Sequence, residues 1–155
     1  MLVVANSSPL NILIRIRYVD VLPVLFNQVV IPGEVARELS RPRTPQIVKD
    51  FIARAPAWLA IRESRPAETS TRLDSGELAA ISLALELKAD FLLIDEKAGR
   101  RAAAENNLTI IGSIGILERA AKRGLLDLEE AFQRIKQTDF HVSDELLDQS
   151  LKRHQ

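Results

Sequence analysis

Small polar and acidic side chains of this 155-residue chain stand just after short apolar runs, where they could do chemistry together. They are Asn6 after residues 2–5, Glu34 and Glu38 after 29–31, Glu77 at the start of a mid-chain helix, and Asp95 after 91–94. If the runs are buried parallel strands, these side chains lie at the carboxyl edge of a sheet, where α/β proteins bind ligands. Carboxylates gathered there need a cation to offset their repulsion. The pattern predicts a metal site.

Asn6 has two open interpretations. It precedes Ser7, Ser8 and Pro9, which predict a helix start with a hydroxyl N-cap and a proline in the first turn. Asn6 can therefore be a turn residue. It can also bind a metal through its amide oxygen, although an amide brings no charge to the site. An Asn at this position separates an enzyme hypothesis from an inactive-enzyme hypothesis.

The carboxylates also have structural interpretations. Glu34 and Glu38 are four residues apart on one helix face, and spacing does not separate them as candidates. Asp74 and Glu77 have the spacing of a capping box, and Asp95 could cap the helix after it. Asp95 is the strongest single candidate, because it ends an apolar run expected at the centre of the sheet.

Basic and hydroxyl side chains near these carboxylates could contact a phosphate. Arg100 and Arg101 follow Lys97 by three and four residues, so each shares a face with Lys97 on the helix predicted after Asp95. A solvated helix face is the alternative. Ser113 follows another apolar run and can bind an anion at a helix start or act as an N-cap.

The periodicity predicts strands that alternate with helices. Strands are expected at 2–5, 29–31, 58–62, 91–94 and 108–111, with helices from 7, at 20–25, 32–39 and 46–55, from 74, at 96–106, from 112 to 123, and at 127–137 and 143–152. Residues 63–72 have no periodicity and are expected to form an exposed loop. The alternation predicts one domain over 1–155, a three-layer α/β/α sandwich with a central, mostly parallel sheet of about five strands.

Composition excludes several classes of function. The chain has 21 Lys and Arg against 21 Asp and Glu, so any contact with nucleic acid must be local or metal-mediated. It has no cysteine, which excludes disulfides and thiolate chemistry. The apolar start lacks the features of a signal peptide or membrane span, and His141 and His154 lack metal-ligand spacing. We expect a cytoplasmic protein with no membrane partner.

Five motifs, in order across nearly the whole chain, resemble the PIN-domain family, and specifically its toxin-like branch related to the VapC ribonucleases. They are VVANSSPL at 3–10, VIPGEV at 30–35 with EL at 38–39, LDSGELAAI at 73–81, ADFLLIDEK at 89–97 with GRRA at 99–102, and IGSIGIL at 111–117. The resemblance implies metal positions at Asn6, Glu38, Glu77 and Asp95, and only this resemblance selects Glu38 over Glu34. The family has an Asp where this chain has Asn6.

The resemblance also implies an activity: Mg²⁺- or Mn²⁺-dependent cleavage of single-stranded RNA by an endoribonuclease, through metal-assisted phosphodiester hydrolysis. Glu38, Glu77 and Asp95 would be catalytic. The residues expected to contact substrate are Ser7, Lys97, Arg100, Arg101 and Ser113. A small antitoxin protein and a second copy of the chain, forming a homodimer, are the expected partners.

The Asn6 position leaves two outcomes open under this resemblance. One is a toxin nuclease of reduced activity, and the other is a degenerate PIN domain that binds RNA or protein without cutting. A receiver-like phosphotransfer domain is a third hypothesis, since such domains also gather acids at strand ends. The chain lacks the aspartyl nucleophile and following lysine-bearing strand that this third hypothesis needs.

Overall fold

The computed structural model describes residues 1–63, 75–95 and 97–154. Its five strands are β1 (Leu2–Ala5), β2 (Gln28–Pro32), β3 (Leu59–Arg62), β4 (Phe91–Leu93) and β5 (Ile110–Ile111). All neighbours pair in parallel, in the order β3-β2-β1-β4-β5. This confirms the predicted α/β class and its five-stranded sheet. Because β1 is central and β4 is next to it, their carboxyl ends lie side by side.

Both faces of the sheet are buried along β1, β2 and β4, which explains why these strands are continuous apolar runs and not alternating ones. The edge strand β3 is exposed at Ile61 and Arg62. One face contributes Val3, Ala5, Val29, Ile31 and Leu93 to a large apolar core. The other contributes Val4, Val30 and Leu92, together with Ile94 just after β4, to a smaller core. The two side-chain sets alternate along each strand, as the pleat requires.

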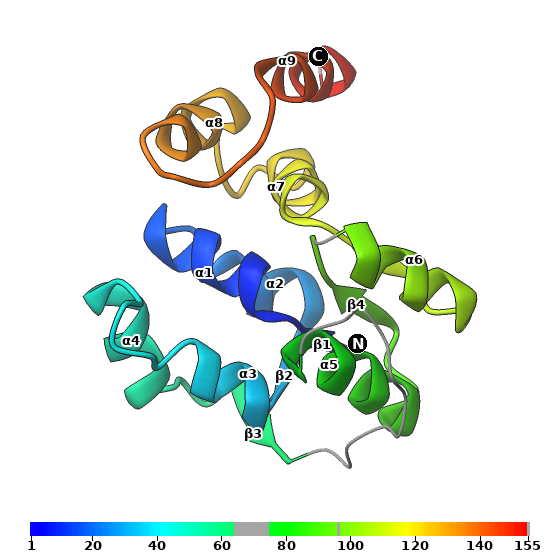
Figure 1. The fold of residues 1–155 in the computed structure, drawn as a ribbon. Coiled ribbons are helices and arrows are strands. Elements are labelled where there is room, and N and C mark those ends of the chain that lie inside the picture. The colour runs from blue at the N-terminus through cyan, green and yellow to red at the C-terminus, as the bar shows by residue number, and fades with distance from the viewer. Residues whose placement is uncertain (64–74, 96, 155) are drawn as a thin grey trace.

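Helices cover the two faces unequally (Figure 1). The larger core includes side chains from α1 (Ser7–Arg15), α2 (Val21–Phe26), α3 (Gly33–Glu38), α4 (Gln46–Ala53), α7 (Ser113–Lys122) and α8 (Leu128–Lys136), and also Leu147 of α9 (Asp144–His154). The smaller core is covered by α5 (Ser75–Leu87) and α6 (Lys97–Glu105). Among the described helices, none combines the length and apolar character needed to cross a membrane.

The start of α1 differs from the sequence prediction. The N-cap residue is Asn6 and not one with a hydroxyl, as predicted, and the Asn6 side chain makes no capping hydrogen bond to the described part of the helix. The physical reason is the sheet: the backbone N–H of Asn6 donates to the Leu93 carbonyl at 2.8 Å, so Asn6 continues the strand ladder before the chain turns. Asn6 is thereby fixed at the exit of β1.

Some predictions fall outside the described residues. Of the predicted loop at 63–72, only Glu63 is described; it is exposed and pairs with Arg37 at 3.1 Å. Asp74, the proposed partner of Glu77 in a capping box, lies outside the described ranges, and so does Glu96. The other predicted helices and strands are present, with ends shifted by one or two residues.

Candidate active site

Asp95 follows β4 at the carboxyl edge of the sheet and is held by three hydrogen bonds. Ser113 donates its backbone N–H to Oδ1 at 2.8 Å and its hydroxyl to Oδ2 at 2.5 Å. The hydroxyl of Ser8 donates to Oδ2 at 3.2 Å. Hydrogen bonds to an ionised carboxylate are about twice as strong as neutral ones. Two helix starts, α1 and α7, therefore fix the orientation of this one carboxylate.

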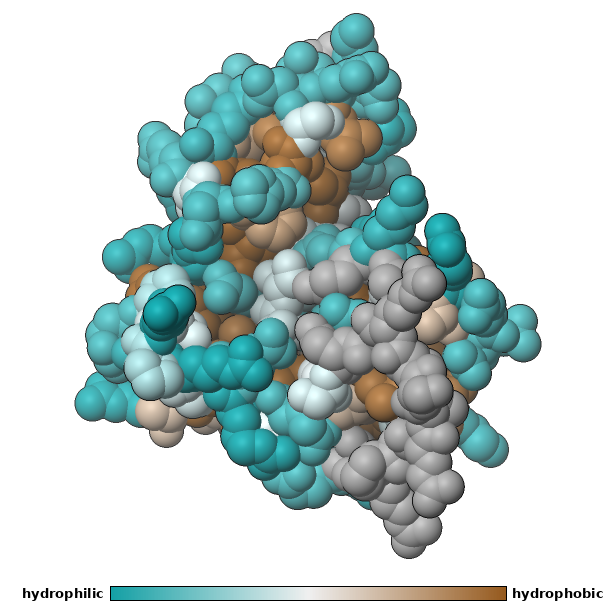
Figure 2. Space-filling model, viewed as in Figure 1, coloured by the Kyte–Doolittle hydropathy of each residue, from teal (hydrophilic) through white to brown (hydrophobic). Residues whose placement is uncertain are grey.

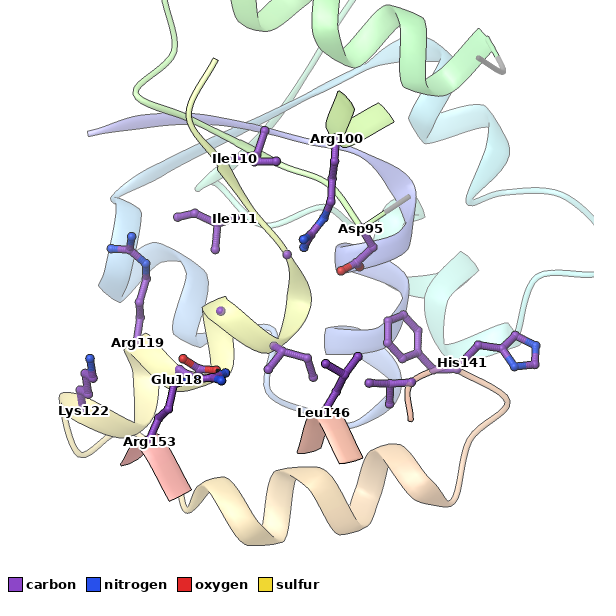
Figure 3. A pocket seen from close by; sticks show the side chains of 15 residues that line it. Asp95, Arg100, Ile110, Ile111, Glu118, Arg119, Lys122, His141, Leu146 and Arg153 are labelled. Atoms are coloured by element: carbon purple, nitrogen blue, oxygen red, sulfur yellow. Dashed lines mark hydrogen bonds and ion pairs between the residues drawn. The ribbon is translucent and has the colours of Figure 1, made fainter. Parts of the chain in front are cut away.

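The turn after β5 brings a cation beside Asp95. Gly112 is the N-cap of α7, and a Cβ atom on it would overlap Nη2 of Arg100 and lie 3.0 Å from Oδ1 of Asp95. Arg100 also donates from Nε to the Ile94 carbonyl at 3.2 Å, so its guanidinium is oriented from α6 toward the carboxyl edge. Figure 3 shows Arg100 and Asp95 facing the same space.

Asn6 and Glu77 are both buried near this edge. Asn6 is 1% exposed and Glu77 is 8% exposed. Glu77 lies in the first turn of α5, and its Oε2 would be 3.5 Å from a Cβ atom on Gly99 of α6. The Glu77 carboxylate therefore lies against the helix that begins just after Asp95.

Glu38 and Glu34 have different surroundings. Glu34 forms an ion pair with Arg37 at 2.9 Å. Glu38 is half-buried and lines a cavity together with Ser7 and Ser8. Glu38 thus shares a cavity with two serines that follow β1 at the carboxyl edge of the sheet.

The donor types suit a hard divalent cation, but the described side chains do not gather three acids around one point. Within residues 1–63, 75–95 and 97–154, no group of three or more His, Asp or Glu side chains is placed to hold a metal ion. Mg²⁺ is often bound through only one or two carboxylates, with waters and substrate phosphates completing its shell. Asp95, Glu38, Glu77 and the amide of Asn6 fit that requirement in chemical kind.

A groove runs across the site. A cavity of about 830 Å³ extends from Asp95 along α7 and the chain after α8, and cavities of about 450 and 510 Å³ continue it past Ser8 toward Glu38. Phe140 lines all three, and Asp95 lines two of them. The charged lining residues are the cations Arg15, Arg41, Arg43, Arg100, Arg119, Lys122 and Arg153 and the acids Glu38, Asp95, Glu118 and Asp139.

Two of the lining acids are neutralised by arginines. Arg15 pairs with Asp139 at 2.6 Å, and its hydrogen bond and charge lower the pKa of that carboxyl. Arg153 pairs with Glu118 at 2.8 Å. Burial acts to raise the pKa of the Glu118 carboxyl, but hydrogen bonds from Arg153 and Ser150 outweigh it, so this pKa lies below the ordinary value. The groove is thus locally cationic in a chain with zero net charge.

The residues predicted to contact substrate lie in different places. Arg100 and Ser113 are next to Asp95, and Ser7 lines the cavity beside Glu38. Lys97 and Arg101 are exposed and do not line any of the three described cavities. The sequence interpretation did not include Ser8 or Phe140. Ser8 is part of the Asn-Ser-Ser-Pro motif, so its place near the site could have been predicted. Phe140 belongs to no motif that indicates a functional site.

A family model described as a PIN domain, DUF3368, matches residues 2–155. The chain belongs to the PIN-domain family. PIN domains are generally nucleases and typically use divalent metals. A solved PilT N-terminus domain protein, SSO1118 from the hyperthermophilic archaeon Sulfolobus solfataricus P2, superimposes with a TM-score of 0.51 and 17% identity, over 92% of this chain and 100% of that chain. That likeness shows a shared fold. No curated relative matches this PIN domain significantly.

Proposed function

We propose that this PIN-domain protein is a Mg²⁺- or Mn²⁺-dependent endoribonuclease that cuts single-stranded RNA, and that it is the toxin of a toxin–antitoxin pair. The observation that carries the proposal is Asp95, a carboxylate fixed by three hydrogen bonds within a cationic groove. Fixed geometry of this kind lowers the entropic cost of placing a reacting phosphate. The family supports nuclease chemistry in general.

The proposed metal positions come from the sequence resemblance to the PIN family, and the roles of the residues around Asp95 follow from their contacts. Asp95, Glu38, Glu77 and the amide of Asn6 would hold the ion, which supplies charge neutralisation and an activated water for phosphodiester hydrolysis. Ser8 and Ser113 would keep both oxygens of Asp95 in place. Arg100, beside Asp95, would contact a phosphate oxygen through its planar guanidinium.

The open groove on both sides of Asp95 supports an internal cut over the removal of terminal nucleotides. Cavities continue from Asp95 in two directions, toward Glu38 on one side and along α7 on the other. A groove that combines cations with an aromatic side chain, here Phe140, also suits single strands, whose bases are free to stack. The homodimer and the antitoxin partner rest on the sequence resemblance to the toxin-like branch.

A catalytically degenerate PIN domain is the second candidate, and Asn6 favours it. Asn6 is almost completely buried at the carboxyl end of the central strand and brings no negative charge. A site with fewer charged ligands binds divalent cations more weakly. Such a protein would bind RNA or a protein partner without cutting.

One cleavage assay separates the two candidates. Wild type, Asn6→Asp, Asp95→Ala and the control Asp148→Ala, which changes an exposed acid of α9, are incubated with an end-labelled single-stranded RNA pool in Mn²⁺ or in EDTA. We expect cutting by wild type that needs Mn²⁺, is lost in Asp95→Ala and persists in Asp148→Ala. Cutting by Asn6→Asp alone would establish the degenerate candidate. Cutting that Asp95→Ala leaves intact would refute the site.

The toxin role has its own test. Expression of the active protein in a bacterial host should arrest growth, and Asp95→Ala should relieve the arrest at equal protein level. Co-expression of the proposed antitoxin, a small protein expected from a neighbouring gene, should also restore growth. The antitoxin should co-purify with the nuclease. Growth that is unaffected by an RNA-cleaving wild type would show a nuclease without a toxin role.

A further inference from the structure

The cavity of about 830 Å³ is lined by both apolar and cationic side chains. The apolar ones include Ile114, Phe140, Val142 and Leu146. The cations Arg119 and Lys122 of α7 and Arg153 of α9 also line the cavity. Figure 3 shows Leu146 on one side of the space, with Arg119 and Lys122 along α7. Figure 2 shows apolar surface between the C-terminal helices and α7, in a rim of hydrophilic residues.

Phe140 is held at the junction of this cavity with the rest of the groove. Its backbone N–H donates to the Thr138 hydroxyl at 3.2 Å, and the preceding residue, Asp139, is tied to Arg15 at 2.6 Å. The Phe140 side chain is half-buried against the main core, yet it lines all three cavities. A ring that is already positioned loses little conformational entropy when a ligand contacts it.

The chemistry of these side chains defines what can fill the cavity. Leu146 is 54% exposed and lines the cavity together with Val142 and Phe140. Exposed apolar side chains that lie together favour an apolar ligand over water. The cationic side favours an anion, because Arg119, Lys122 and Arg153 outnumber Glu118, which pairs with Arg153. The Arg119 guanidinium also lies over the Phe91 ring, 5.1 Å from its centre, which holds it in place. A ligand with a planar apolar part and a negative charge meets both demands. A nucleotide is such a ligand.

We propose that this cavity is a nucleotide subsite, in which a base of the substrate strand lies on Phe140 and Leu146 while its backbone phosphate contacts Lys122 and Arg119. The inference rests on the proposed function, which places the scissile phosphate at Asp95, at the end of the same cavity. It adds a base-contacting position to the site and assigns it to the chain that follows α8. Stacking on an aromatic ring tolerates every base, so the subsite confers affinity and not strict sequence choice.

The test measures binding without cleavage. Fluorescein-labelled single-stranded RNA of fixed sequence is titrated with protein in EDTA, and affinity is read from fluorescence anisotropy. Each nucleotide is then replaced in turn by an abasic one. In wild type, one position should lose about fivefold or more in affinity, the range that corresponds to about 1–3 kcal/mol per stacked base. Phe140→Leu keeps an apolar side chain there and should abolish that position-specific loss.

Charge variants test the cationic side. Lys122→Glu should weaken binding of every oligonucleotide and reduce its salt dependence, because a phosphate contact releases counterions. Lys152→Glu is the matched control, since Lys152 is an exposed helical lysine outside the described cavities. Leu146→Asp should also weaken binding, whereas Val24→Asp, at a site 45% exposed on α2, should not. Emission of Trp58, the single tryptophan, verifies that each variant is folded.

The outcomes separate this inference from the proposed function. Suppose that wild type cleaves RNA, but that no abasic position lowers its affinity in a way that depends on Phe140. This result would overturn the subsite and leave the nuclease proposal intact. Base-dependent binding without cleavage in Mn²⁺ would support the subsite and reject the nuclease. If Lys122→Glu binds RNA like wild type but loses a co-purifying protein partner, the cavity is a protein-docking site and the inference is wrong.

Discussion

Removal of the Ser113 hydroxyl tests how Asp95 is held. Ser113→Ala deletes the shortest of the three hydrogen bonds to this carboxylate, the 2.5 Å contact to Oδ2, and leaves the backbone N–H and the Ser8 hydroxyl in place. Ser113 is fully buried, so bulk water does not replace the hydroxyl. A hydrogen bond to a charged group contributes about 1.5–3 kcal/mol. The free energy of unfolding should fall by about that amount, nearer the lower end because two donors remain.

Urea denaturation followed by Trp58 emission measures this loss. Trp58 packs against Phe51 at a ring separation of 6.0 Å and does not line the groove, so the substitution does not perturb the fluorophore directly. At about 2–4 °C per kcal/mol for a domain of this size, the melting temperature should fall by roughly 3–12 °C. Ser150→Ala is the matched control, because the buried Ser150 hydroxyl donates to a carboxylate of Glu118 at 2.7 Å.

The two serine variants should differ in activity although they lose similar stability. Ser113→Ala should cut RNA at least about tenfold more slowly, since a loss of about 1.4 kcal/mol in positioning corresponds to a factor of ten. Ser150→Ala should cut at the wild-type rate below its unfolding transition. A change in unfolding free energy below about 0.5 kcal/mol for Ser113→Ala, or strict additivity with Asp95→Ala in a double-mutant cycle, would refute the reasoning.

Three further changes probe other contacts. Asn6→Asp places a charge at a position that is 1% exposed, so the melting temperature of this variant in EDTA should lie below that of wild type. Added Mg²⁺ should raise the melting temperature of the variant more than that of wild type, and an equal rise in both proteins contradicts a metal position there. Because the pKa of Glu118 is lowered in the folded state, its stabilising effect is complete above about pH 4.5 and is lost as the pH falls through the lowered value. Arg153→Gln should therefore lower the melting temperature at neutral pH and have little effect well below that pH. Gly112→Ala should displace the Arg100 guanidinium and crowd Oδ1 of Asp95, and so weaken RNA binding. Arg100→Gln removes the guanidinium alone and should also weaken RNA binding, with little change in melting temperature; wild-type binding by Arg100→Gln would show that Arg100 is unimportant.

The fold could be predicted from the sequence because its signals are local. Residues 2–5, 29–31 and 91–94 are short apolar runs bounded by turn residues, which is the pattern of strands buried on both faces. Their parallel pairing follows from the helices between them, and it places Asp95 at the carboxyl edge. The position of Asp95 needs no information beyond the end of one strand.

The rest of the site depends on contacts between distant segments. Ser8 contacts Asp95 from the start of α1, and this contact exists only because β1 and β4 are neighbours in the sheet. The same pairing makes Asn6 the N-cap in place of a serine, through the hydrogen bond from the Asn6 backbone N–H to the Leu93 carbonyl. Phe140 lines the groove while it packs against the main core, next to the Arg15–Asp139 pair. Contacts of this kind join segments far apart in the sequence and leave no periodic signal.

The wall formed by residues after α8 has a consequence for biosynthesis. Asp95, Ser8 and Glu38 leave the ribosome well before Phe140, Leu146 and Arg153, which complete the groove. At about 5–20 residues per second, roughly 3–12 s separate the synthesis of Asp95 from that of Arg153. A nascent chain therefore carries its carboxylates near translating RNA for seconds before the groove that would bind a strand is complete. Under the proposed function, chain order delays RNA binding by this PIN domain until α8 and α9 have been made.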